Sequence, residues 1–171
     1  MSDQSKIWYA VYCRSRFEKR TFKLLEESGI EAYLPLVKTL KQWSDRRKWV
    51  EVPLFRSYIF VRIIPKEYFK VLQMEGVVRF VTFEGKAVPI PPKQITAIRH
   101  FMNTEKDQMI SPIELSIGDE VEIQRGPLMG LKGHLINLQG KKKVKIEIEA
   151  IGKSIYITVP TSYLKITRSN H

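Results

Sequence analysis

Basic side chains near the amino terminus have the spacing needed to bind one phosphate backbone. Lys19, Arg20 and Lys23 lie three, four and seven residues after Arg16, so on a helix these cations share one side. A row of this kind binds a polyanion in a salt-sensitive manner and without base preference. A solvated helix face is the alternative explanation for any one of these residues.

A second basic group lies between two tryptophans. Arg46, Arg47 and Lys48 are consecutive, and Trp43 and Trp49 flank the charged segment. Indole rings can stack on unpaired bases while cations hold phosphates, which suits the edge of an opened duplex. The alternative is a charged turn with one tryptophan packed on a sheet. We expect that packing for Trp49, and the role of the three cations stays open.

Aromatic side chains at expected strand ends form a third group. Tyr12 closes one apolar run, and Phe55 lies beside Leu54 and Tyr58 just before another. Large apolar side chains are more often part of a core than of an interface. Residue types alone therefore favour packing over partner binding at these positions.

Residues suited to catalysis are few and scattered. Cys13, His100 and His134 are the evident nucleophile and base candidates, and they fall in different expected elements. The sequence contains no nucleophile-elbow motif, glycine-rich phosphate loop or close metal-ligand spacing. Cys13 is expected to be a small core residue. We therefore expect no catalysis, no cofactor and no metal.

The composition favours a polyanionic partner. The chain has 171 residues and a formal net charge of +11, and most of the basic excess lies in residues 1–103. This length allows one domain or two small ones, and the charge favours a nucleic-acid neighbour of the first part. One cysteine, with no signal peptide or long apolar span, leads us to expect a cytoplasmic protein without membrane contact.

Hydrophobic patterns predict strands and helices in the first part of the chain. We expect an antiparallel sheet with helices on its sides. The expected helices are 15–28, 66–74 and 92–103, the last of these opened by proline. The expected strands are 7–13, 31–39, 49–54, 57–63 and 77–83.

The second part of the chain alternates apolar and polar residues. Val144, Ile146 and Ile148 alternate with charged residues, and Ile155, Ile157 and Val159 repeat the pattern, which is typical of strands. Earlier, Gly126-Pro127 turns the chain, and Gly130 and Gly133 mark sharp bends or close backbone approaches. Residues 104–116 have no periodicity and are expected to form a linker.

Two patterns in this chain resemble known families. The run from Gly118 to Gly133, with the alternating strands after it, resembles the KOW motif of a five-stranded SH3-like barrel. The first part resembles a NusG amino-terminal domain, in the order and spacing of Trp8 to Arg14, Phe17-Glu18-Lys19, Pro53 to Val61, Gly76 to Val81 and Val88 to Pro91. The implied fold class is α+β, with an antiparallel sheet flanked by helices in residues 1–103, a linker at 104–116 and a small barrel in 117–171.

The resemblance implies a transcription elongation factor. In NusG proteins, the positions matching Tyr12 and Phe55 lie in an apolar depression that docks the RNA polymerase clamp. The neighbouring Leu54 and Tyr58 complete the expected polymerase-binding group. Residues matching Arg14 and the following helix contact non-template DNA in specialised paralogues. The resemblance therefore implies a protein, expected to be a monomer, that bridges the clamp and non-template or upstream DNA.

Departures from the family pattern narrow this reading. Leu128, followed by Met129, stands where housekeeping members carry a phenylalanine that helps dock termination factor Rho or a ribosomal protein. Arg56-Ser57 replaces a typical Pro-Gly. These departures favour a specialised antitermination paralogue acting at selected operons, whose barrel binds a ribosomal protein or another factor. A housekeeping NusG and a ribosome-associated KOW RNA-binding protein remain the alternatives.

Overall fold

A computed structural model describes residues 5–103, 117–138 and 140–168. The chain divides into two compact units, Met1–Ile90 and Pro91–His171. The linker that we expected at 104–116 lies outside the described residues. Both units combine antiparallel strands with a small number of helices, so the α+β fold class is confirmed.

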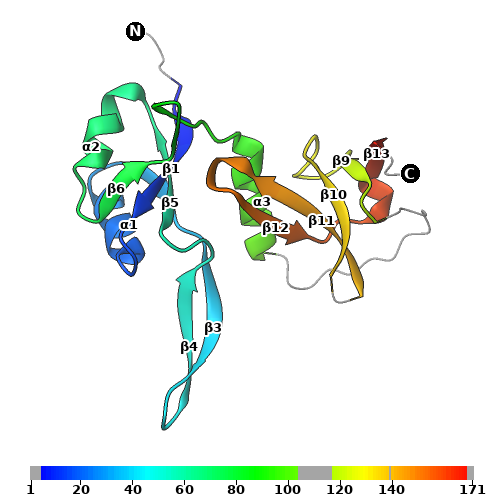
Figure 1. The fold of residues 1–171 in the computed structure, drawn as a ribbon, viewed down its shortest axis with the longest axis horizontal. Coiled ribbons are helices and arrows are strands. Elements are labelled where there is room, and N and C mark those ends of the chain that lie inside the picture. The colour runs from blue at the N-terminus through cyan, green and yellow to red at the C-terminus, as the bar shows by residue number, and fades with distance from the viewer. Residues whose placement is uncertain (1–4, 104–116, 139, 169–171) are drawn as a thin grey trace. The chain divides into compact units, whose positions relative to one another are not determined.

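A four-stranded antiparallel sheet forms the centre of the first unit (Figure 1). Its strand order is β2 (Glu31–Tyr33), β5 (Tyr58–Ile63), β1 (Ile7–Cys13) and β6 (Val77–Phe80). The central pair is strongly β-prone in sequence, and β1 runs in register with β5 from Ile7 opposite Ile63 to Tyr12 opposite Tyr58. This register aligns the ends of the two central strands.

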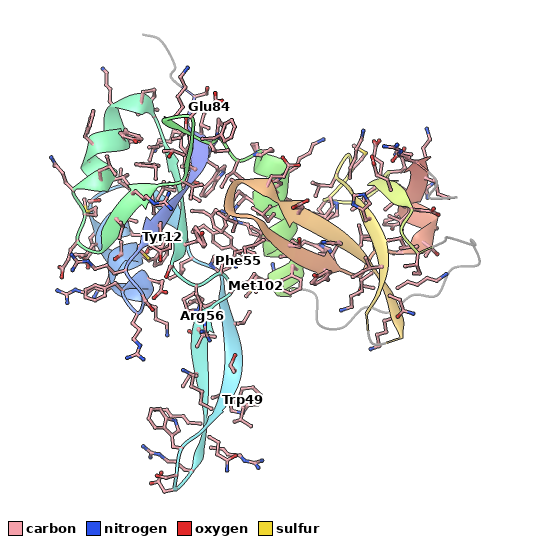
Figure 2. All side chains as sticks on the ribbon, viewed as in Figure 1. Tyr12, Trp49, Phe55, Arg56, Glu84 and Met102 are labelled. Atoms are coloured by element: carbon pink, nitrogen blue, oxygen red, sulfur yellow. The ribbon has the colours of Figure 1, made fainter. Side chains whose placement is uncertain are left out.

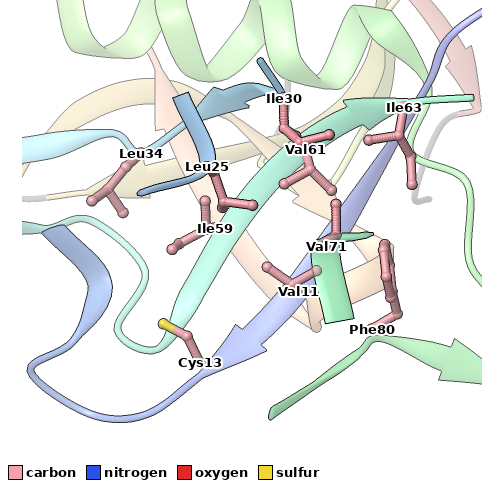
Figure 3. Close-up of a cluster of buried hydrophobic side chains, with 10 residues drawn as sticks. All are labelled: Val11, Cys13, Leu25, Ile30, Leu34, Ile59, Val61, Ile63, Val71 and Phe80. Atoms are coloured by element: carbon pink, nitrogen blue, oxygen red, sulfur yellow. The ribbon is translucent and has the colours of Figure 1, made fainter. Parts of the chain in front are cut away.

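The core of this unit lies where alternate strand residues meet the helices α1 (Glu18–Glu27) and α2 (Tyr68–Leu72). Figure 3 shows Val11, Ile59 and Phe80 from the strands beside Leu25 and Val71 from the two helices. Successive strand residues point to opposite faces, so burial of one alternating set fixes the register. The predicted strands 7–13 and 57–63 are thus confirmed within one residue.

Three other local predictions needed correction. The helix expected from residue 15 begins only at Glu18, because Arg16 has a φ of 70° that a right-handed helix does not allow. The second helix is preceded by a short 3-10 turn at Pro65–Glu67. The strand expected at 77–83 is interrupted at Val81, after which β7 (Thr82–Phe83) pairs with β8 (Lys86–Ala87).

A long hairpin projects from the four-stranded sheet as a separate two-stranded sheet (Figure 1). Its strands are β3 (Leu36–Gln42) and β4 (Arg47–Pro53). The single strand expected at 31–39 is therefore wrong, because the chain forms β2 and then β3 there, and β4 begins two residues before the expected 49. At the tip, the Trp43 N–H donates to the Arg46 carbonyl oxygen over 2.8 Å. Cross-strand pairing continues to Gln42 opposite Arg47, so the turn that we expected is confined to residues 43–46, and Arg47 and Lys48 belong to β4.

The second unit contains a five-stranded antiparallel sheet and helix α3 (Pro92–Asn103), which has the predicted bounds but was expected in the first domain. The predicted alternation is confirmed, because Val144, Ile146 and Ile148 are all buried. At Gly133 a Cβ atom would collide with the Lys145 carbonyl oxygen and the Val144 side chain, which confirms the predicted close approach. The strand order is β12 (Lys153–Ile157), β11 (Lys141–Ile148), β10 (Lys132–Leu138), β9 (Glu120–Ile123) and β13 (Leu164–Arg168).

In the part of the chain that the structure describes, every helix is too short or too polar to span a bilayer.

Candidate functional site

An aromatic cluster with one cation lies at the end of the central strands. Tyr12 stands opposite Tyr58 on one side and opposite Arg79 on the other, and directly opposed residues share a sheet face. The Tyr12 and Tyr58 rings meet edge to face at 5.7 Å, and the Arg79 guanidinium lies 5.5 Å from the centre of the Tyr12 ring. Both tyrosines are half-buried, so the cluster is partly accessible.

The neighbouring residues of the expected docking group differ in exposure. Leu54 is half-buried, and its N–H donates to the Pro35 carbonyl oxygen over 2.8 Å. Phe55 is only 6% exposed and meets the Phe60 ring edge to face at 6.1 Å. Figure 2 shows Phe55 next to Arg56, which is exposed. Of the four aromatic and aliphatic residues in this group, Phe55 alone is buried.

Glu18 fixes the loop that carries this group. Its side chain is buried, and its Oε1 accepts a hydrogen bond of 3.0 Å from the Ser57 N–H. Ser57 has a φ of 66°, a left-handed conformation that costs a non-glycine residue roughly 1–2 kcal/mol. The bond to a carboxylate offsets this cost. Next to it, the Ser57 carbonyl oxygen accepts the Cys13 N–H over 2.8 Å, which ties the loop to β1.

The Cys13 thiol is protonated at neutral pH. Burial raises its pKa to about 11, and the negative charge of Glu18 acts in the same direction. Because a thiolate is the reactive form of cysteine, Cys13 is a poor nucleophile here. The prediction that Cys13 is a core residue is confirmed by its complete burial.

The cations after β1 are exposed but differ in their partners. Arg20 forms an ion pair of 3.1 Å with Glu75, and Lys23 lies 3.8 Å from Glu27. Within the described residues, neither Arg14, Arg16 nor Lys19 forms an ion pair. The helical row is correct only for the residues on α1, since Arg16 precedes the helix. Exposed pairs of this kind stabilise little, so all five cations are accessible to an anion.

The basic hairpin is exposed along its length. Arg46 lies at the tip, while Arg47 and Lys48 begin β4. Trp49 is 66% exposed and Trp43 is 55% exposed, so the expectation that Trp49 packs on a sheet is wrong. The reason is that β3 and β4, which carry Trp49 (Figure 2), pair only with each other, and the described core of this unit lies on the four-stranded sheet (Figure 3).

The barrel corner presents one of its two candidate residues. Leu128 is buried, at 3% exposed, whereas Met129 is 61% exposed. The corner is closed by the Gly130 N–H, which donates to the Ile123 carbonyl oxygen over 2.7 Å. A partner at this corner would meet the Met129 side chain, while Leu128 supports the turn from inside.

The described residues contain no group of three or more His, Cys, Asp or Glu side chains placed to hold a metal ion.

Two residues of the site were missed from the sequence. Arg79 could have been found only through the pairing of β1 with β6, which is not local in sequence. Glu18 was noted as part of a motif, and its burial depends on the distant loop at Ser57. Neither the type nor the spacing of these residues in the sequence indicated that Arg79 and Glu18 belong to the site.

Comparisons with known proteins agree on one family. The family model described as transcription termination factor nusG matches residues 6–99. A transcription termination/antitermination protein NusG from Staphylococcus epidermidis is 25% identical over 170 residues, which covers 91% of this chain and 92% of that protein. The protein of the same name from Staphylococcus aureus gives the same identity and coverage.

A solved structure gives the same fold. It concerns domain interaction in Thermotoga maritima NusG, and it matches with a TM-score of 0.55 at 22% identity. The match covers 95% of this chain and 98% of that chain. Similarity therefore extends over both units and is not confined to the first.

Proposed function

Because this chain belongs to the NusG family of transcription termination and antitermination factors, we propose that it binds RNA polymerase and favours continued elongation at selected operons. The observation that carries the proposal is the accessible cluster of Tyr12, Tyr58 and Arg79, in which Tyr12 lies two residues before the exposed cation Arg14. An apolar contact and a phosphate contact can thus be made side by side. Such an arrangement suits a protein that bridges polymerase and nucleic acid.

The polymerase clamp docks on the surface formed by Tyr12, Leu54 and Tyr58. Each of these side chains is half-buried, so each combines a fixed position with exposed apolar atoms, as interface anchors do. Phe55 is buried, and its ring packs against Phe60. Its role is to hold the loop in position. Arg79 adds a charge at the rim of this surface.

Nucleic acid is bound by two sets of cations in the first unit, and non-template or upstream DNA is the proposed ligand. These side chains are exposed, and they contribute to the positive net charge of the chain. Contacts of this type fix position without reading sequence. The sets are Arg14, Arg16, Lys19, Arg20 and Lys23 after β1, and Arg46, Arg47 and Lys48 on the hairpin.

The mechanism is bridging and involves no chemical step. Simultaneous contact with clamp and DNA holds the clamp closed around the nucleic acids. A closed clamp has a lower population of the paused state, so elongation is favoured by a population shift. The second unit recruits a ribosomal protein or another factor at raised effective concentration, through the corner at Met129 and Leu128.

The barrel corner supports a specialised role. The side chain in the position of the family's phenylalanine is Leu128, and it is buried, so the corner offers Met129 in place of an exposed aromatic ring. This argues against Rho as the partner and for an antitermination paralogue over a housekeeping NusG. Chromatin mapping against polymerase distinguishes the two, since a housekeeping factor covers most transcribed genes and a specialised one covers few.

Binding to purified polymerase tests the proposal. Tyr12→Ala should weaken binding about thirtyfold, because loss of an interface anchor costs about 2 kcal/mol. Phe69→Ala is the matched control, since Phe69 is an aromatic residue 71% exposed on α2. Equal affinity of both variants and the wild type would exclude the Tyr12 surface. Co-purification with ribosomal particles in the absence of polymerase would favour the ribosomal alternative.

A further inference from the structure

The projecting hairpin exposes apolar side chains that no part of the proposed docking surface uses. Leu40 is 43% exposed and Trp49 is 66% exposed, and the two residues stand directly opposite each other across β3 and β4. Trp43, at 55% exposed, lies at the turn beyond them. Exposed apolar groups that cluster in this way mark an interaction site more often than scattered ones do.

The hairpin has two faces of different chemistry. Directly opposed residues share a face, so the pair of Leu40 and Trp49 marks one side, which we call the indole face. The adjacent pair, Lys41 opposite Lys48, lies on the other side. Like charges placed opposite each other repel, and a bound polyanion relieves that repulsion. The next pair, Gln42 opposite Arg47, returns a cation to the indole face.

The charge of the hairpin indicates which ligand fits. Its two acidic residues are outnumbered by five basic ones. The hairpin therefore favours an anionic ligand over an uncharged apolar surface of another protein. Indole faces stack on bases only where the bases are unpaired, and cations at the same site hold the phosphates. A duplex keeps its base faces inside the stack. The basic residues are Lys38, Lys41, Arg46, Arg47 and Lys48, and the acidic ones are Asp45 and Glu51.

We propose that the indole face binds unpaired bases of a single nucleic-acid strand, which stack on Trp49, with Trp43 at the turn beyond it, while Arg47 on the same face holds a phosphate. This inference rests on the proposed binding of nucleic acid, and it specifies that the ligand of the hairpin is single-stranded. A strand of seven residues, as β4 is, extends roughly 20 Å. The hairpin is therefore long enough to contact several successive nucleotides.

The experiment measures binding of the full chain to three probes by fluorescence anisotropy. The probes are an oligothymidylate of about 12 nucleotides, within the site size of single-strand binders, an abasic phosphodiester of equal length, and a duplex of equal length. We expect the oligothymidylate to bind about tenfold more tightly than the abasic strand, because each stacked base adds binding free energy. We expect the duplex to show no such advantage over the abasic strand.

Variants assign the difference to individual residues. Trp49→Ala should remove most of the advantage of the oligothymidylate, and Trp49→Phe should retain most of it, because phenylalanine still stacks. Arg47→Gln should weaken binding to both single strands equally and lower the salt dependence. Phe69→Ala, which removes an exposed aromatic residue outside the hairpin, should change nothing. Thermal melting of each variant checks that the fold is retained.

Intrinsic fluorescence gives a second readout. Trp8 is 6% exposed, so quenching by bound oligothymidylate reports on Trp43 and Trp49. Equal affinity for the oligothymidylate and the abasic strand overturns the inference, as does an unchanged advantage in Trp49→Ala. If Trp49→Ala weakens polymerase binding alone, the hairpin is a protein-docking surface and the inference also fails. Polymerase binding through Tyr12 is measured separately, so its failure is distinguishable.

Discussion

Removal of the Glu18 carboxylate should release the loop that carries the docking surface. In Glu18→Ala the Ser57 N–H loses its acceptor at 3.0 Å, in a place where both residues are buried. A hydrogen bond to a charged group contributes about 1.5–3 kcal/mol. Glu18 also lies in the first turn of α1, where a negative charge adds about 0.3–1 kcal/mol. We expect Glu18→Ala to lower the free energy of unfolding by about 2–4 kcal/mol.

A second substitution separates the loop from the helix. Ser57→Gly should stabilise the protein by about 1 kcal/mol, because glycine adopts the φ of 66° without the steric cost of a side chain. In the double variant this gain should persist, while the contribution of Glu18 to the helix is still lost. Polymerase affinity should fall in Glu18→Ala and recover in part in the double variant, as the loop again prefers its native conformation.

Urea denaturation followed by circular dichroism measures these free energies. Glu26→Ala is the matched control, since Glu26 is an exposed glutamate on the same helix, and it should change stability by less than about 0.5 kcal/mol. A Glu18→Ala variant as stable as this control would refute the reasoning. It would mean that the cost of burying the carboxylate equals what its hydrogen bond contributes.

Four further outcomes are expected. Phe55→Ala should lower the free energy of unfolding by about 3–5 kcal/mol because the ring is buried; unchanged urea denaturation would contradict that burial. Burial raises the pKa of Cys13 to about 11, against 9.0 in the unfolded chain. The neutral thiol should therefore contribute fully to the free energy of unfolding below pH 9, and this contribution should be lost as the pH rises towards 11. In urea denaturation, Cys13→Ala should not show this loss of stability at alkaline pH. A loss of equal size in the variant would mean that another group causes it. Replacement of Arg16, Lys19 and Lys23 by glutamine should flatten the salt dependence of binding to an elongation complex, and an unchanged slope would identify a solvated face. NMR of the second unit, alone and in the full chain, should give the same strand shifts, and helical shifts in either would contradict a permanent barrel.

Local patterns were sufficient for most elements of this protein. The alternation of Val144, Ile146 and Ile148 has the strand period, and burial of that set follows from it. Helix α3 was predicted with its bounds, because prolines before it provide a start signal that acts within one turn. These features depend on neighbours in sequence, and the sequence by itself therefore determined them.

Exposure and partnership of the site residues were decided by tertiary structure. Phe55 is buried and Trp49 is exposed, the reverse of what was expected for a docking residue and a packed one. The residue type indicates that an aromatic ring favours burial. Which ring is buried depends on the pairing of strands that are distant in sequence. The Arg79 contact with Tyr12 and the Glu18 bond to Ser57 arise in the same way, since β1 meets β6 and α1 meets the loop only in the folded chain.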